Sequence, residues 1–106
     1  MELDDLLDRV WTSEYTCNEF ACEAWQKITG EDLTQRLTDF LNGSSGFTSH
    51  EEPISPCIVF FTNGKQTPTH VGVFFEQKLL HLSMRGGQYV PLDIVKMNFR
   101  QARYYT

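Results

Sequence analysis

The sequence is poor in the residues that mark disulfide scaffolds and metal sites. It has only three cysteines, Cys17, Cys22 and Cys57, and no Cys-x-x-Cys pair. An odd number of cysteines leaves at least one thiol free, so we do not expect a disulfide framework. A zinc site built from Cys17, Cys22, His70 and His81 is also not expected, because the spacing of the two cysteines on a helix points their thiols apart. The sequence therefore predicts no metal and no cofactor.

Long apolar runs and clustered positive charge are missing as well. No hydrophobic segment approaches the roughly 18–20 residues of a membrane-spanning helix. The nine Lys and Arg residues are scattered, and the net charge is −5, whereas a nucleic-acid-binding protein usually carries a basic stripe. We expect neither a membrane nor a nucleic acid as partner. The acidic N-terminus does not resemble a signal peptide, so we expect the protein to be cytoplasmic as synthesised, unless another route exports it.

What remains is the composition of an ordinary globular protein, which fits one domain over residues 1–106. Helical periodicity dominates the first part of the chain, and strand-like segments dominate the second part. We expect helices over residues 3–11, 17–29 and 31–41, and strands over residues 57–61, 70–75, 78–83, 88–92 and 99–105. The sequence therefore predicts an α+β fold in which N-terminal helices pack on a small antiparallel sheet.

The second predicted helix places a cysteine in its first turn. Thr16 and Glu19 have the spacing of a capping box, so Thr16 is the expected N-cap and Cys17 the first helical residue. Unpaired backbone N–H groups at a helix start favour a thiolate and can also stabilise an oxyanion. We therefore consider Cys17 a candidate nucleophile. The alternative is that Cys17 is simply a small buried residue on the apolar face of the helix.

Two histidines in the predicted hairpin are candidates for the base. If the hairpin has the two-residue loop Glu76-Gln77, His70 and His81 become diagonal neighbours on one face, roughly 7–8 Å apart at Cα. One imidazole can then act as base while the other fixes its tautomer and orientation. A three-residue loop would instead turn His81 to the opposite face.

Four segments, in the same order along the chain, resemble motifs of the NlpC-type cell-wall peptidases of the papain-like cysteine peptidase superfamily. Thr-Cys-Asn-Glu-Phe-Ala at 16–21 resembles the Asp-Cys-Ser-Gly-Phe-Val start of the family's catalytic helix. Pro-Cys-Ile-Val-Phe-Phe at 56–61 is similar to its Pro-Gly-Asp-Leu-Val-Phe-Phe strand, and His-Val-Gly-Val-Phe at 70–74 to its His-Val-Gly-Ile-Tyr. Leu-His-Leu-Ser at 80–83, followed by Arg-Gly-Gly at 85–87, resembles its Ile-His-Ala-Ser and Gly-Gly segment.

The resemblance implies a papain-like domain that cleaves amide bonds in peptidoglycan stem peptides through an acyl-enzyme. It assigns Cys17 as nucleophile, His70 as general base and His81 as the orienting residue of a Cys-His-His triad. The substrate would be a peptide or peptidoglycan fragment, and the protein would need delivery to the cell wall. Thr16 replaces the family's aspartate, and Asn18-Glu19 replace its Ser-Gly, so the substrate is less well determined than the fold. Acyl transfer, thioester cleavage, protein deamidation and an inactive binding module of the same fold remain alternatives.

Other residues receive lesser roles. Tyr15 and Arg85 are the candidates for contact with substrate, Arg85 because a guanidinium can pair with a carboxylate. Cys22 lies about 140° around the helix from Cys17. We therefore expect Cys22 and Cys57 to be structural.

Overall fold

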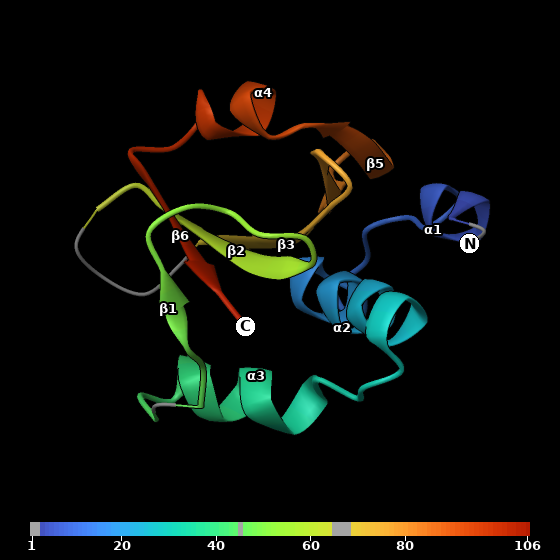
Figure 1. The fold of residues 1–106 in the computed structure, drawn as a ribbon. Coiled ribbons are helices and arrows are strands. Elements are labelled where there is room, and N and C mark those ends of the chain that lie inside the picture. Colours follow the sequence, from blue (N-terminus) through green and yellow to red (C-terminus); the bar gives the residue numbers. More distant parts are fainter. Residues whose placement is uncertain (1–2, 45, 65–68) are drawn as a thin grey trace.

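The computed structural model describes residues 3–44, 46–64 and 69–106 (Figure 1). Its helices are α1 (Asp4–Leu7), α2 (Cys17–Thr29), α3 (Thr34–Leu41) and α4 (Leu92–Lys96). Its strands are β1 (Ser49–His50), β2 (Cys57–Thr62), β3 (His70–Phe75), β4 (Lys78–Ser83), β5 (Gly86–Pro91) and β6 (Gln101–Tyr105). The α+β class and the antiparallel sheet predicted from the sequence are confirmed.

The six strands form one antiparallel sheet in the order β1-β6-β2-β3-β4-β5. The last strand of the chain, β6, is inserted between β1 and β2, while β2 to β5 follow one another as neighbours. Every residue of β2 is buried. A strand whose two faces are both covered needs apolar side chains at every position. This explains why the segment Cys-Ile-Val-Phe-Phe is apolar without alternation.

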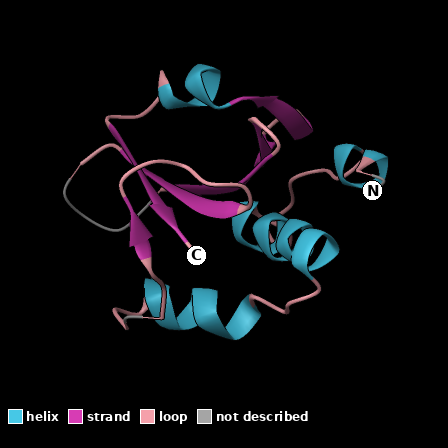
Figure 2. Ribbon diagram, in the orientation of Figure 1, coloured by secondary structure: helices cyan, strands magenta, loops and turns pink. Residues whose placement is uncertain are grey.

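Helices cover both faces of the sheet, as Figure 2 shows. On one face, α2 and α3 enclose a core in which Phe20 packs with Phe60 and Leu80. On the other face, α4 closes a second core that contains Phe61 and Val95. Successive side chains of a strand point to opposite faces, so Phe60 and Phe61 belong to different cores.

The local signals around α2 and the β3–β4 hairpin predicted the structure correctly. Thr16 caps α2 through a capping box with Glu19, and Gly30 ends the helix in the left-handed conformation with φ 82°. The hairpin has the two-residue loop Glu76-Gln77, with positive φ at both residues. Such loops match the right-handed twist of the flanking strands and set their register.

Several sequence-based assignments were wrong. The strand expected over residues 88–92 is Gly86–Pro91, and the strand expected over residues 99–105 is Gln101–Tyr105. The first helix ends at Leu7 instead of residue 11, because the chain turns where the Thr12 side chain accepts hydrogen bonds from the next backbone N–H groups. The third helix begins at Thr34, where the Asp32 carboxylate accepts a hydrogen bond from the Thr34 backbone N–H. The helix α4 was missed, since five residues are too few to show helical periodicity.

Candidate active site

The start of α2 holds Cys17 in a defined position. The Glu19 carboxylate accepts a hydrogen bond from the Thr16 backbone N–H at 2.7 Å, and the Thr16 hydroxyl accepts one from the Asn18 backbone N–H at 3.3 Å. These contacts use up part of the hydrogen-bonding capacity of the first turn. Cys17 is the first residue of the helix, as predicted. Its side chain packs against the core that lies between the sheet and the helices α2 and α3.

The environment of the Cys17 thiol differs from the sequence-based expectation. Burial raises the pKa of Cys17, although the backbone N–H groups of Val71, Cys17 and Asn18 act in the opposite direction and the charge of Glu19 raises the pKa further. The expectation that the helix start lowers this pKa below its ordinary value was wrong, because desolvation of the thiolate exceeds the effect of the N–H dipoles. Cys17 is therefore a neutral thiol at pH 7 and requires a base.

The two predicted histidines are in direct contact. Nε2 of His70 lies 3.0 Å from Nδ1 of His81, and the two ring planes are almost perpendicular at 89°. His70 is the first residue of β3 and stacks on the ring of Phe99, at 5.6 Å between centroids. The hairpin loop has two residues, and this loop length brings the histidines together, as the sequence analysis expected for that case.

A third polar residue completes the row. Nε2 of His81 lies 3.1 Å from Oε1 of Gln88, and the two residues are partners across β4 and β5. The sequence analysis did not single out Gln88. The missed signal was the two-residue connection Met84-Arg85, which pairs Ser83 with Gly86 and so sets Gln88 opposite His81.

Cys17 lies beside the strand that begins with His70. Its thiol is close enough to the Val71 backbone N–H for that dipole to lower its pKa, and Val71 directly follows His70. Within the described ranges, no hydrogen bond joins the Cys17 sulfur to either histidine. The polar contact of the sulfur is with Oδ1 of Asn18, at 4.0 Å. Nδ1 of His70 is likewise without a hydrogen-bond partner among the residues described, which leaves this nitrogen available.

Both imidazoles are neutral at pH 7. Burial, with a smaller effect from His81, lowers the pKa of His70 to about 4. Burial also lowers the pKa of His81, and the hydrogen bond to Gln88 partly opposes that shift. A neutral imidazole can accept a proton, so the pair has the protonation state that a general base needs at pH 7.

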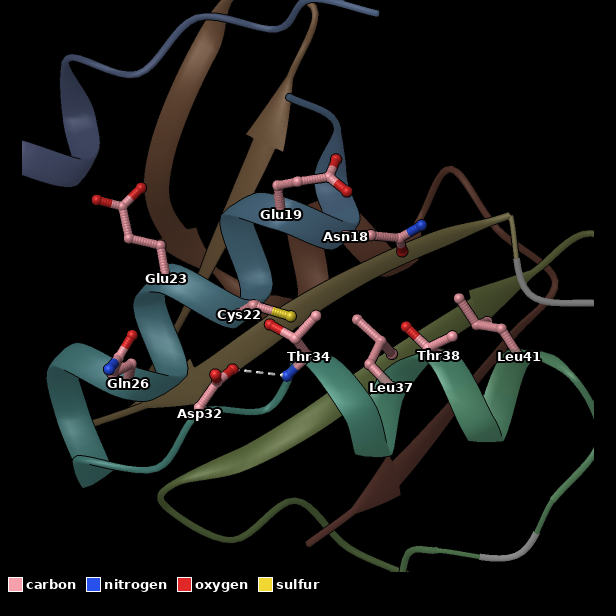
Figure 3. A pocket seen from close by; sticks show the side chains of 10 residues that line it. All are labelled: Asn18, Glu19, Cys22, Glu23, Gln26, Asp32, Thr34, Leu37, Thr38 and Leu41. Carbon is pink, nitrogen blue, oxygen red and sulfur yellow. Dashed lines mark hydrogen bonds between the residues drawn. The ribbon is translucent and has the colours of Figure 1, made fainter. Parts of the chain in front are cut away.

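A hollow of about 340 Å³ lies between α2 and α3 (Figure 3). Cys22, Glu19, Asp32 and Leu37 are among the residues that line it, and the Cys22 sulfur points toward α3. Neither Cys17 nor a histidine lines this hollow. Asn18 connects the two regions, because its side chain lines the hollow and is also the polar contact of the Cys17 sulfur.

The two residues expected to contact substrate have different surroundings. The Tyr15 hydroxyl donates a hydrogen bond to the Glu23 carboxylate, which is also paired with Arg9 at 2.5 Å. Arg85 is exposed in the turn between β4 and β5. Its backbone N–H donates to the Ser83 hydroxyl.

The other two cysteines are free thiols. Cys57 is fully buried and burial raises its pKa to about 11, while Cys22 is half-buried. In the part of the chain that the structure describes, no group of three or more His, Cys, Asp or Glu side chains is placed to hold a metal ion. None of the helices within the same ranges has the length and apolar character needed to cross a membrane.

Comparison with known proteins gave no relative: no protein-family model, curated protein or solved structure matches this chain. The site must therefore be interpreted from its own geometry.

The depressed pKa of His70 predicts a loss of stability in acid. The unfolded chain binds a proton at this residue near pH 6.5, whereas the folded protein does so only near pH 4. Between these values the unfolded state binds more protons, so the free energy of unfolding falls as the pH decreases, by up to roughly 3 kcal/mol. Urea denaturation at pH 7.5, 5.5 and 4.5 measures this loss.

The matched control is His70→Asn, which retains every carboxylate but removes the titrating ring. This variant is expected to lose clearly less stability than the wild type between pH 7.5 and 4.5. An equal loss in both proteins would show that His70 is not held neutral by burial.

Proposed function

We propose that the protein is a thiol hydrolase that cleaves amide bonds through a covalent acyl-enzyme on Cys17. The observation that carries this proposal is the row of hydrogen-bonded side chains His70, His81 and Gln88, which starts on the strand whose second residue, Val71, has its backbone N–H near the Cys17 thiol. A helix-start thiol on one side and a buried imidazole pair on the adjoining strands would supply a nucleophile, a base and an orienting group. The order of these residues along the chain also fits the papain-like NlpC-type resemblance.

In the proposed reaction, His70 takes the proton of the Cys17 thiol while the sulfur attacks the substrate carbonyl carbon. Backbone N–H groups at the start of α2 stabilise the oxygen that becomes negatively charged. The tetrahedral intermediate then collapses, the C–N bond breaks, and the leaving amine receives the proton from His70. Water, deprotonated by the same imidazole, attacks the thioester and releases the acid, and the proton returns to the Cys17 sulfur.

The proposed substrates are peptides of the peptidoglycan stem type, as the resemblance implies. The part of the peptide beyond the scissile bond would extend over Asn18 toward the hollow between α2 and α3, because Asn18 contacts both regions. Tyr15 and Arg85 are proposed as further contacts at the margins of this surface. Acyl transfer to another acceptor, thioester cleavage and protein deamidation would use the same groups and are distinguished by the products.

The proposal is tested by incubating the protein with soluble peptidoglycan fragments and, separately, with a thioester and a glutamine-containing protein. For a stem-peptide hydrolase we expect new amino termini from the fragments, and in acid-quenched samples a mass increase on Cys17 that equals the acyl part of the substrate. Cys17→Ala is the control and should show neither product nor adduct. Absence of product and adduct with all three substrate classes would leave a binding module of the same fold.

A further inference from the structure

We infer that Gln88 selects the tautomers of both buried histidines and thereby keeps Nδ1 of His70 free to accept a proton. The geometric inference concerns the hydrogen-bonded row alone. Its consequence for catalysis rests on the proposed function. Gln88 is therefore a positioning residue, acting on the base through His81.

The argument begins with the chemistry of the amide. Oε1 of Gln88 can only accept a hydrogen bond, and it faces Nε2 of His81 at 3.1 Å. The proton of the neutral His81 ring must then lie on Nε2, which leaves Nδ1 as an acceptor. Nδ1 of His81 faces Nε2 of His70 at 3.0 Å, so His70 carries its own proton on Nε2. Nδ1 of His70 is left with a lone pair.

Without the amide, a second arrangement of the pair would be equally well bonded. His81 would carry its proton on Nδ1 and donate it to Nε2 of His70, and the His70 proton would move to Nδ1. In that arrangement Nδ1 of His70 carries a proton, has no free lone pair and cannot accept the proton of the Cys17 thiol. With Oε1 of Gln88 facing Nε2 of His81, only the first arrangement keeps a hydrogen bond at that contact. The rings of Phe61 and Phe99 against His70 offer no hydrogen-bonding atom.

The surroundings support assignment of this role to Gln88 alone. No charged side chain within the described ranges forms a hydrogen bond or an ion pair with either imidazole. Burial and the charge of His81 lower the pKa of His70, and the hydrogen bond with Gln88 opposes the lowering of the pKa of His81 by burial. The amide is also held in place by the backbone register, since His81 and Gln88 are opposite one another in the β4–β5 pair.

The test uses nitrogen NMR of the histidine side chains, which distinguishes a protonated from an unprotonated ring nitrogen, on the full chain at pH 7.5. We expect Nε2–H on both His70 and His81 in the wild type. Gln88→Met preserves the approximate shape of the side chain but removes the acceptor, and should produce a mixture of the two tautomers. His50, which bonds to Thr106 at 2.8 Å, provides an internal reference that the substitution should not change.

Gln88→Glu provides a second, opposite readout. The carboxylate retains the acceptor, so the wild-type tautomers should persist at high pH. Its negative charge should raise the pKa of His81 by about one unit or more, so that the pair becomes protonated at a higher pH than in the wild type. The pH at which the NMR signals titrate should increase accordingly, and an unchanged titration would show that position 88 does not act on the histidine pair.

Activity is measured in the same variants. For Gln88→Met, kcat should fall roughly 10- to 100-fold with KM little changed, since the residue acts through another side chain. Nδ1–H on His70 in the wild type, or unaltered tautomers in Gln88→Met, would overturn the inference. Wild-type tautomers as expected in a protein without activity would overturn the proposed function and leave the role of Gln88 in place.

Discussion

Cys17→Ala is expected to abolish turnover of the acyl substrate, with kcat reduced by roughly 10⁴-fold or more, in a protein that remains folded. No other thiol is placed to replace it, because Cys57 is fully buried and Cys22 faces the hollow between α2 and α3. The measurement is single-turnover acylation, with circular dichroism to establish that the variant is folded.

Cys22→Ser and Cys57→Ser are the matched controls for this loss. Both should retain turnover, and Cys57→Ser should lower the free energy of unfolding by about 1 kcal/mol because it places a hydroxyl in a fully buried site. A folded Cys22→Ser variant without activity, together with an active Cys17→Ala variant, would move the nucleophile to the hollow between the two helices.

Gly87→Ala is expected to have the largest effect on stability. A Cβ atom at this position would lie 2.1 Å from the backbone oxygen of Leu6 and 3.0 Å from the ring of Phe20. The backbone at Leu6 cannot move freely, because Leu6 is fully buried and the Gly87 N–H donates to the Arg9 carbonyl at 3.0 Å. We expect a loss of about 3 kcal/mol or more, measured by urea denaturation.

Gly64→Ala is the control for the glycine substitution. No residue that the structure describes lies within 4 Å of a Cβ at Gly64, so the stability of this variant should change by less than about 0.5 kcal/mol. Similar stability of the two variants would show that α1 is not docked closely against β5. Since Gly87 precedes Gln88, the same measurement also shows how firmly the strand that carries the positioning amide is held.

Much of the site was predictable because its signals are local. The Thr16–Glu19 capping box depends on four consecutive residues, and it placed Cys17 in the first turn of a helix. The His70–His81 contact depends on the length of one hairpin loop. The sequence left a two-residue and a three-residue loop open, and the structure has the two-residue loop Glu76-Gln77. In both cases the interacting residues are near neighbours along the chain.

The parts that the sequence did not predict depend on segments that meet only in the folded protein. The pKa of Cys17 rises because distant strands bury its thiol, and a local helix-start argument contains no information about that desolvation. The row of polar groups ends at Gln88 because the β4–β5 register sets it opposite His81.

The amino-acid sequence by itself therefore determined the α+β class and the capped helix with its cysteine, and it made the contact of the two histidines depend on the length of one hairpin loop. The tertiary structure decided the protonation states of these groups and the orientation of their hydrogen bonds. The physical reason is that helix caps and tight hairpins are short-range interactions, whereas desolvation and the selection of a tautomer are set by everything that packs around a group.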